Sequence, residues 1–208
     1  MLPCPPTPEF DPVRHVYRWQ GRVVPGVSSI LGAGGHSCQF YPDDPKYRNR
    51  GTAIHYACQL LDADELDLDE FYRLDERLPR EKRIAGYIDQ YREFLSDVKP
   101  RWTMTEQAMY SPKLRVAGTL DRAGLVVNSW GIVDIKTGTI PPSVGIQTAG
   151  YCCIIYDGEE PPADIRRWVL RLTGTRRYQF RECENRSDYH CFLNAVKIYY
   201  QQETALCR

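Results

Sequence analysis

Two segments bounded by glycines, Gly118-Thr-Leu-Asp-Arg-Ala-Gly124 and Gly131-Ile-Val-Asp-Ile-Lys-Thr-Gly138, decide the fold expected for this chain. The second has the β-branched, apolar residues of a strand buried in a sheet, with Asp134 and Lys136 two positions apart. Because side chains alternate along a strand, these two point to the same face. An acid and a lysine are costly on a buried strand, so the pair indicates a functional site.

A second strand is predicted over residues 115–128, with Gly124 at a bend. The residues at 128–131 suit the turn of a hairpin, and pairing across that turn brings Asp121 alongside Asp134. Behind the hairpin, a turn at two consecutive prolines leads into a predicted helix over residues 143–156. Gln147 and Tyr151 are four apart on that helix and therefore share a face.

The other elements extend an α/β pattern. A helix over 45–63 carries His55, a helix over 79–98 follows, and a strand over 102–110 carries Glu106. Further strands are predicted at 167–173 and 178–183, and a last helix at 187–202. The order α-β-β-β-α-β predicts a mixed β-sheet flanked by helices on both faces.

The chain is predicted to form one domain over residues 13–208, because 208 residues with 42% hydrophobic side chains are enough for one core. Within it, a hairpin over 13–24 and a short helix over 27–31 form an N-terminal elaboration. Residues 1–12 are rich in proline and are expected to be a flexible leader that does not pack.

Composition limits the partners and the compartment. There is no apolar run long enough for a membrane span and no signal-peptide pattern, so we expect a cytoplasmic protein without membrane contact. The formal net charge is zero, so any attraction for phosphates has to come from local clusters. The candidate basic residues, which could equally be solvated surface, are Lys46, Arg48, Arg50, Arg166, Arg167, Arg171, Arg176 and Arg177.

Taken in order, Gly-x-x-Asp, Asp-x-Lys-Thr and Gln-x-x-x-Tyr resemble the PD-(D/E)XK nuclease superfamily, specifically its RecB-like exonuclease branch. The segment from Arg50-Gly51 to His55 resembles the first motif of that branch, whose histidine is a metal ligand, and Glu106 resembles the acid on the preceding strand. Residues 17–31 are similar to the start of many phage-encoded members.

This resemblance implies a restriction-endonuclease-like core and a Mg²⁺- or Mn²⁺-dependent deoxyribonuclease using one or two ions. The catalytic residues it implies are Asp121, Asp134, Lys136 and Glu106. The implied metal ligands are His55, Asp121, Asp134 and Ile135. The implied DNA-binding residues are Gln147, Tyr151, Arg50 and Thr137.

The expected reaction is hydrolysis of phosphodiester bonds from DNA ends during recombination, repair or phage genome processing, with a recombinase or annealing protein as a further partner. Carboxylates such as Asp121 and Asp134 suit hard divalent cations, and Lys136 can orient a water nucleophile and stabilise charge on the phosphate. The alternatives are a structure-specific endonuclease and a non-catalytic nucleic-acid-binding subunit of the same fold.

Each residue also has a plainer interpretation. Asp-x-Lys can be a surface ion pair, His55 a core histidine, and Glu106 a solvent-facing residue of an edge strand; their joint occurrence favours the catalytic interpretation. No iron–sulfur cluster is expected, because Cys152 and Cys153 are adjacent, the later cysteines are far apart, and no C-x-x-C spacing occurs.

Overall fold

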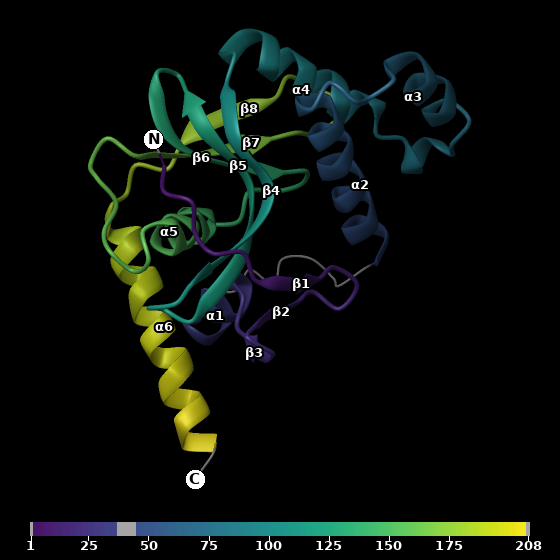
Figure 1. The fold of residues 1–208 in the computed structure, drawn as a ribbon. Coiled ribbons are helices and arrows are strands. Elements are labelled where there is room, and N and C mark those ends of the chain that lie inside the picture. Colours follow the sequence, from purple (N-terminus) through teal and green to yellow (C-terminus); the bar gives the residue numbers. More distant parts are fainter. Residues whose placement is uncertain (1, 37–44, 207–208) are drawn as a thin grey trace.

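The computed structural model describes residues 2–36 and 45–206, which form two β-sheets flanked by helices (Figure 1). The strands are β1 (Glu9–Asp11), β2 (Val16–Trp19), β3 (Arg22–Val24), β4 (Arg101–Ser111), β5 (Val116–Val126), β6 (Ser129–Lys136), β7 (Arg166–Arg171) and β8 (Gln179–Glu182). The helices are α1 (Val27–Ala33), α2 (Pro45–Asp62), α3 (Leu68–Asp75), the 3₁₀ helix η1 (Arg80–Lys82), α4 (Ala85–Val98), α5 (Val144–Ile155) and α6 (Ser187–Leu206).

The larger sheet has five strands in the order β4-β5-β6-β7-β8. All neighbours are antiparallel except β6 and β7, which are parallel and connected through α5. A parallel pair needs a long crossover, and α5 provides it. The predicted mixed α/β architecture is therefore confirmed.

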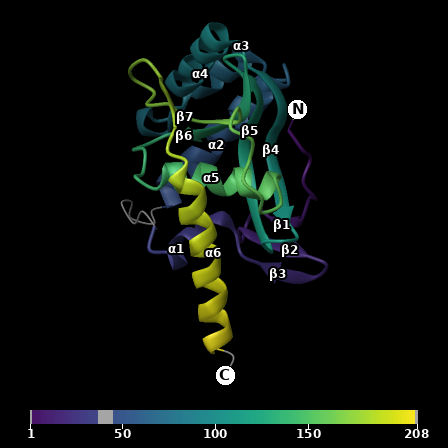
Figure 2. The same ribbon diagram turned by 90° about the vertical axis from the view of Figure 1, so that its left-hand side faces the viewer.

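The helices cover both sides of this sheet (Figures 1 and 2). One apolar cluster joins α1, α5 and α6 to the sheet through residues such as Ile30, Ile154 and Phe192. The other joins α2 and α4 to it through Ile54 and Phe94. The helix predicted over 79–98 is divided: η1 precedes α4, which begins at residue 85.

The β5–β6 hairpin is tighter than predicted. Its turn consists of Val127 and Asn128, both with positive φ (47° and 61°), between the paired residues Val126 and Ser129. Positive φ at both central positions gives a two-residue turn whose twist matches that of the strands. The predicted turn at 128–131 was wrong, because Ser129 and the residues after it belong to β6. Gly124 lies within β5, opposite a register shift in β4.

The N-terminal leader packs against the molecule, so the prediction that residues 1–12 do not pack was wrong. Leu2 is buried in the core with α1 and α5, and the backbone carbonyl of Pro6 accepts a hydrogen bond from the Tyr110 amide at 2.8 Å. The leader therefore covers β4, an edge strand whose outer backbone groups need partners. Its last residues form β1, which pairs with β2.

The predicted N-terminal hairpin is confirmed as β2 and β3, joined by Gln20 and Gly21 with positive φ. Among the described helices, none is both long and apolar enough to cross a membrane.

Candidate metal centre

The ladder between β4 and β5 is interrupted at Glu106 and Asp121. The pairs Thr105–Arg122 and Gln107–Leu120 flank the position where Glu106 faces Asp121. Glu106 has φ +45°, a left-handed conformation that costs energy for a residue with a side chain. The strained backbone turns the Glu106 side chain toward His55 and Arg122. There, its exposed fraction is 21% although β4 is an edge strand. The solvent-facing alternative for Glu106 was therefore wrong.

The ladder between β5 and β6 ends one residue before the position where Asp121 would face Asp134. Its last pair is Arg122–Val133, whereas β6 continues beside β7 as far as Lys136. The amide of Ile135 lies beyond the paired part of β5, and it donates to Asp121 Oδ2 at 2.6 Å. The divergence of the two strands thus holds the Asp121 carboxylate beside the backbone of Ile135.

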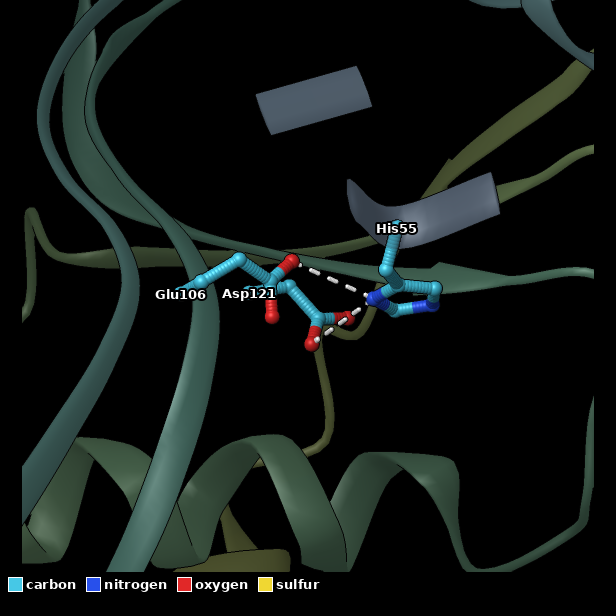
Figure 3. A group of neighbouring side chains, drawn as sticks. All are labelled: His55, Glu106 and Asp121. Carbon is cyan, nitrogen blue, oxygen red and sulfur yellow. Dashed lines mark hydrogen bonds and ion pairs between the residues drawn. The ribbon is translucent and has the colours of Figure 1, made fainter. Parts of the chain in front are cut away.

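His55 reaches the two carboxylates from α2 (Figure 3). Its Nδ1 lies 3.2 Å from Glu106 Oε1 and 3.5 Å from Asp121 Oδ1. Among the residues that the structure describes, these three form the one group of metal-ligating side chains whose ligand atoms all lie within 4.8 Å of one another. One imidazole and two carboxylates suit Mn²⁺, and the carboxylate oxygens suit Mg²⁺.

Asp134 and Lys136 share a strand face as predicted. Lys136 Nζ lies 2.8 Å from Asp134 Oδ2, and the Asp134 side chain is 1% exposed. Asp134 is outside the group of three, although its negative charge contributes to raising the pKa of Asp121. The structure therefore brings Glu106, assigned to catalysis, together with His55 and Asp121, and leaves Asp134 paired with the lysine.

The helix residues Gln147 and Tyr151 share a face as predicted, with Gln147 Nε2 donating to Tyr151 Oη at 3.1 Å. Both line the same cleft as the group of three, which has a volume of about 790 Å³. Arg50 and Thr137 do not line it. The Arg50 guanidinium lies over the Tyr87 ring, 5.6 Å from its centroid, and Thr137 lies against α2 at Gly51.

A buried arginine behind the site holds it in place. Arg122 is fully buried and donates to Glu106 Oε1 at 2.7 Å, to Asp62 Oδ2 at 2.5 Å and to the backbone carbonyl of Asp121 at 2.6 Å. Asp62 also accepts from Tyr91 Oη and Trp102 Nε1, each at 2.9 Å. This network connects the end of α2 to the acids of β4 and β5.

Arg122 and Asp62 were not among the residues predicted for the site. Arg122 follows Asp121 directly, and alternation along a strand places the two side chains on opposite faces. The sequence could therefore have predicted that Arg122 is a buried cation and needs an acidic partner. Its partner could not be identified, because Asp62 is 60 residues away in the chain, at the end of the helix predicted over 45–63.

His55 affects the pKa of Glu106 and of Asp121, and both carboxylates affect the pKa of His55. Burial lowers the pKa of His55, but the charge of Asp121 and the hydrogen bond and charge of Glu106 outweigh it and raise that pKa to about 8. Burial and the charges of Asp134 and Glu106 raise the pKa of Asp121 to about 6. Burial opposes ionisation of Glu106, yet His55 and Arg122 hold its pKa below the ordinary value.

Metal affinity is expected to rise with pH, because a divalent cation competes with the protons of His55 and Asp121. The pKa of His55 is about 8 and that of Asp121 about 6, so between these two pH values His55 carries a proton and Asp121 does not. Over this window Mn²⁺ affinity should increase by about tenfold per pH unit, until about pH 8. Isothermal titration calorimetry with Mn²⁺ at several pH values measures this affinity. His55→Gln should lose the dependence above about pH 7; a wild-type affinity independent of pH across this window would contradict the assignment.

The predicted basic cluster of the C-terminal half does not form a free patch. Arg167 is 3% exposed and donates to the carbonyls of Gly145 and Asn185 and to Asp188. The other arginines of the cluster with partners are Arg166 with Glu182, Arg171 with the Gly138 carbonyl, and Arg177 with Glu93. These arginines have partners within the chain, whereas the side chains of Lys46 and Arg48 lie outside the described residues.

Cys152 and Cys153 are buried in α5, where burial raises the pKa of each thiol to about 12. They pack in the core as protonated thiols.

The chain was also compared with known proteins. It matches no protein-family model, and no curated protein matches its sequence significantly. The inference of function therefore rests on the chain's own residues and their geometry.

Proposed function

We propose that this protein is a metal-dependent DNA exonuclease that hydrolyses phosphodiester bonds from DNA ends. The observation that carries the proposal is the group of His55, Glu106 and Asp121, which converges from a helix and two adjacent strands at the wall of a large cleft. Strand interruptions at both acids and a raised pKa at Asp121 are features that concentrate at active sites.

The arrangement of elements supports a restriction-endonuclease-like core. A helix, three antiparallel strands, a crossover helix and a parallel strand follow one another as α4, β4, β5, β6, α5 and β7. The acids and Lys136 lie where β5 and β6 diverge, and Gln147 and Tyr151 lie on the crossover helix. This order supports the PD-(D/E)XK resemblance without a family match.

The proposed roles follow from charge and position. His55, Glu106 and Asp121 would hold Mg²⁺ or Mn²⁺, which when bound neutralises the phosphate and lowers the pKa of a water molecule. Asp134 orients Lys136 through their ion pair, and the ammonium group stabilises negative charge on the phosphate. Gln147 and Tyr151 contact the DNA backbone from the cleft wall.

The test is hydrolysis of an end-labelled linear duplex and a single strand with Mg²⁺, Mn²⁺ or EDTA. Wild-type protein should degrade linear DNA with either ion, with Mn²⁺ at least as effective as Mg²⁺ because an imidazole is among the ligands. Lys136→Ala should lower the rate by about a hundredfold, since it removes a charge that stabilises the transition state. Released fragments give the polarity.

Two results would reject parts of the proposal. Efficient cutting of closed circles would replace the exonuclease assignment with an endonuclease, because an exonuclease requires an end. Binding of DNA without turnover in either metal would favour the non-catalytic subunit. Lys82→Ala is the matched control, because Lys82 is exposed in η1 and should leave the rate unchanged.

A further inference from the structure

The three-stranded sheet presents an aromatic surface to the same cleft. Phe10 and Tyr17 stack with ring centroids 4.6 Å apart and planes inclined by 20°. His15 meets both rings edge-on, at centroid distances of 5.3 and 5.6 Å. All three residues line the cleft that contains the candidate metal centre, and the outer ring, Phe10, is only partly buried.

This aromatic surface is anchored to β5, the strand that carries Asp121. Tyr17 Oη is hydrogen-bonded to Thr119 Oγ1 at 2.9 Å. Thr119 and Asp121 are two apart on β5, so their side chains point to one face and are separated by about 7 Å.

The turn that carries His15 is held by hydrogen bonds of its own. His15 has φ +53°, a left-handed conformation that is uncommon for a non-glycine residue. Asp11 Oδ1 accepts hydrogen bonds from the amides of Val13 and Arg14, at 3.0 and 3.1 Å, and so stabilises the turn. A pre-ordered ring loses little conformational freedom on binding.

A further exposed ring lies on another wall of the cleft. Tyr56 follows His55 on α2, lines the cleft, and has an exposed fraction of 60%. An aromatic side chain this exposed gains free energy when a flat apolar surface covers it. The cleft therefore has aromatic rings from α2 and from the β1–β2 hairpin in the same lining as His55, Glu106 and Asp121.

We propose that Phe10, His15 and Tyr56 form a stacking subsite for unpaired bases, so that the protein engages DNA through a single-stranded end. The inference rests on the proposed function, because the metal centre in the same cleft would hold a phosphate of the strand whose base is stacked. Stacking on aromatic rings is tolerant of sequence and contributes about 1–3 kcal/mol per base. It requires a base outside the duplex, which distinguishes a frayed or single-stranded end from paired DNA.

The test measures binding in EDTA, apart from hydrolysis, with a short single-stranded oligodeoxynucleotide that carries 2-aminopurine at its end. Wild-type protein should quench the fluorescence of this base by stacking. Phe10→Ala and Tyr56→Ala should each weaken binding by about tenfold and reduce the quenching, whereas binding of a blunt duplex changes little. Phe10→Trp keeps a ring and should retain both signals, which separates lost stacking from a disturbed β1.

Tyr72→Ala is the matched aromatic control, because Tyr72 lies on α3 outside the cleft lining. Unchanged binding and quenching in both alanine variants would overturn the stacking subsite, and the proposed hydrolysis would be untouched. Quenching lost in the variants, with no cleavage of any DNA by the wild type in Mg²⁺ or Mn²⁺, would support the subsite and reject the proposed function.

Discussion

Asp121→Asn is expected to lower metal-dependent DNA hydrolysis by about a thousandfold and to weaken Mn²⁺ binding. The substitution keeps the shape of the side chain but removes the negative charge that lies 3.5 Å from His55 Nδ1. The measurements are the initial rate on an end-labelled substrate and a calorimetric titration with Mn²⁺. A rate within about tenfold of wild type would exclude Asp121 from the proposed metal centre.

This variant is not expected to unfold. Burial and neighbouring acids raise the pKa of Asp121 to about 6, so its ionisation costs folding free energy as the pH rises through that value. At neutral pH a neutral asparagine should therefore be as stable as wild type or more stable, which is the usual exchange between activity and stability. Asp69→Asn, at an exposed position of α3, is the matched control and should leave rate and affinity unchanged.

Arg122→Met is expected to have the largest effect on stability, lowering the free energy of unfolding by about 3–5 kcal/mol. The arginine side chain is 0% exposed and the Asp62 side chain 4%, so removing the guanidinium leaves a buried carboxylate without its cation. It also frees Glu106 from one of its two partners. Urea unfolding measures the loss.

A double variant and a surface control make this result specific. Arg122→Met combined with Asp62→Leu should recover part of the loss, because no buried charge then remains at that position. Arg177→Met removes an ion pair with side chains 80% and 38% exposed and should change stability by less than about 0.5 kcal/mol. A loss below about 1 kcal/mol for Arg122→Met would contradict the structural role.

Local patterns were enough to predict most elements of the fold. Alternation of apolar residues placed Asp134 and Lys136 on one face of β6, and four-residue spacing placed Gln147 and Tyr151 on one face of α5. Errors occurred where backbone detail mattered, as at the Val127–Asn128 turn. The exact position of a turn, to within one or two residues, depends on which residues of the two strands pair. The alternation of apolar residues along each strand does not specify that pairing.

The sequence predicted which residues belong to the candidate site, but not which of them lie together. His55, Glu106 and Asp121 were all candidates, yet Asp134 was assigned to both catalysis and the metal and Glu106 to catalysis alone, while the structure groups Glu106 with the other two. The reason is the left-handed backbone at Glu106, which redirects a side chain that a regular edge strand leaves in solvent.

By itself, the sequence of this protein determined the α/β class, the strand or helix that carries each candidate site residue, and the pairing of Asp134 with Lys136. These depend on periodicities of two and about 3.6 residues that are local to each segment. The tertiary structure alone decided which acids meet His55, that Arg122 binds Asp62 behind them, and that the leader covers β4. Such contacts join residues tens of positions apart, and their partners are selected by burial and charge only after the chain has folded.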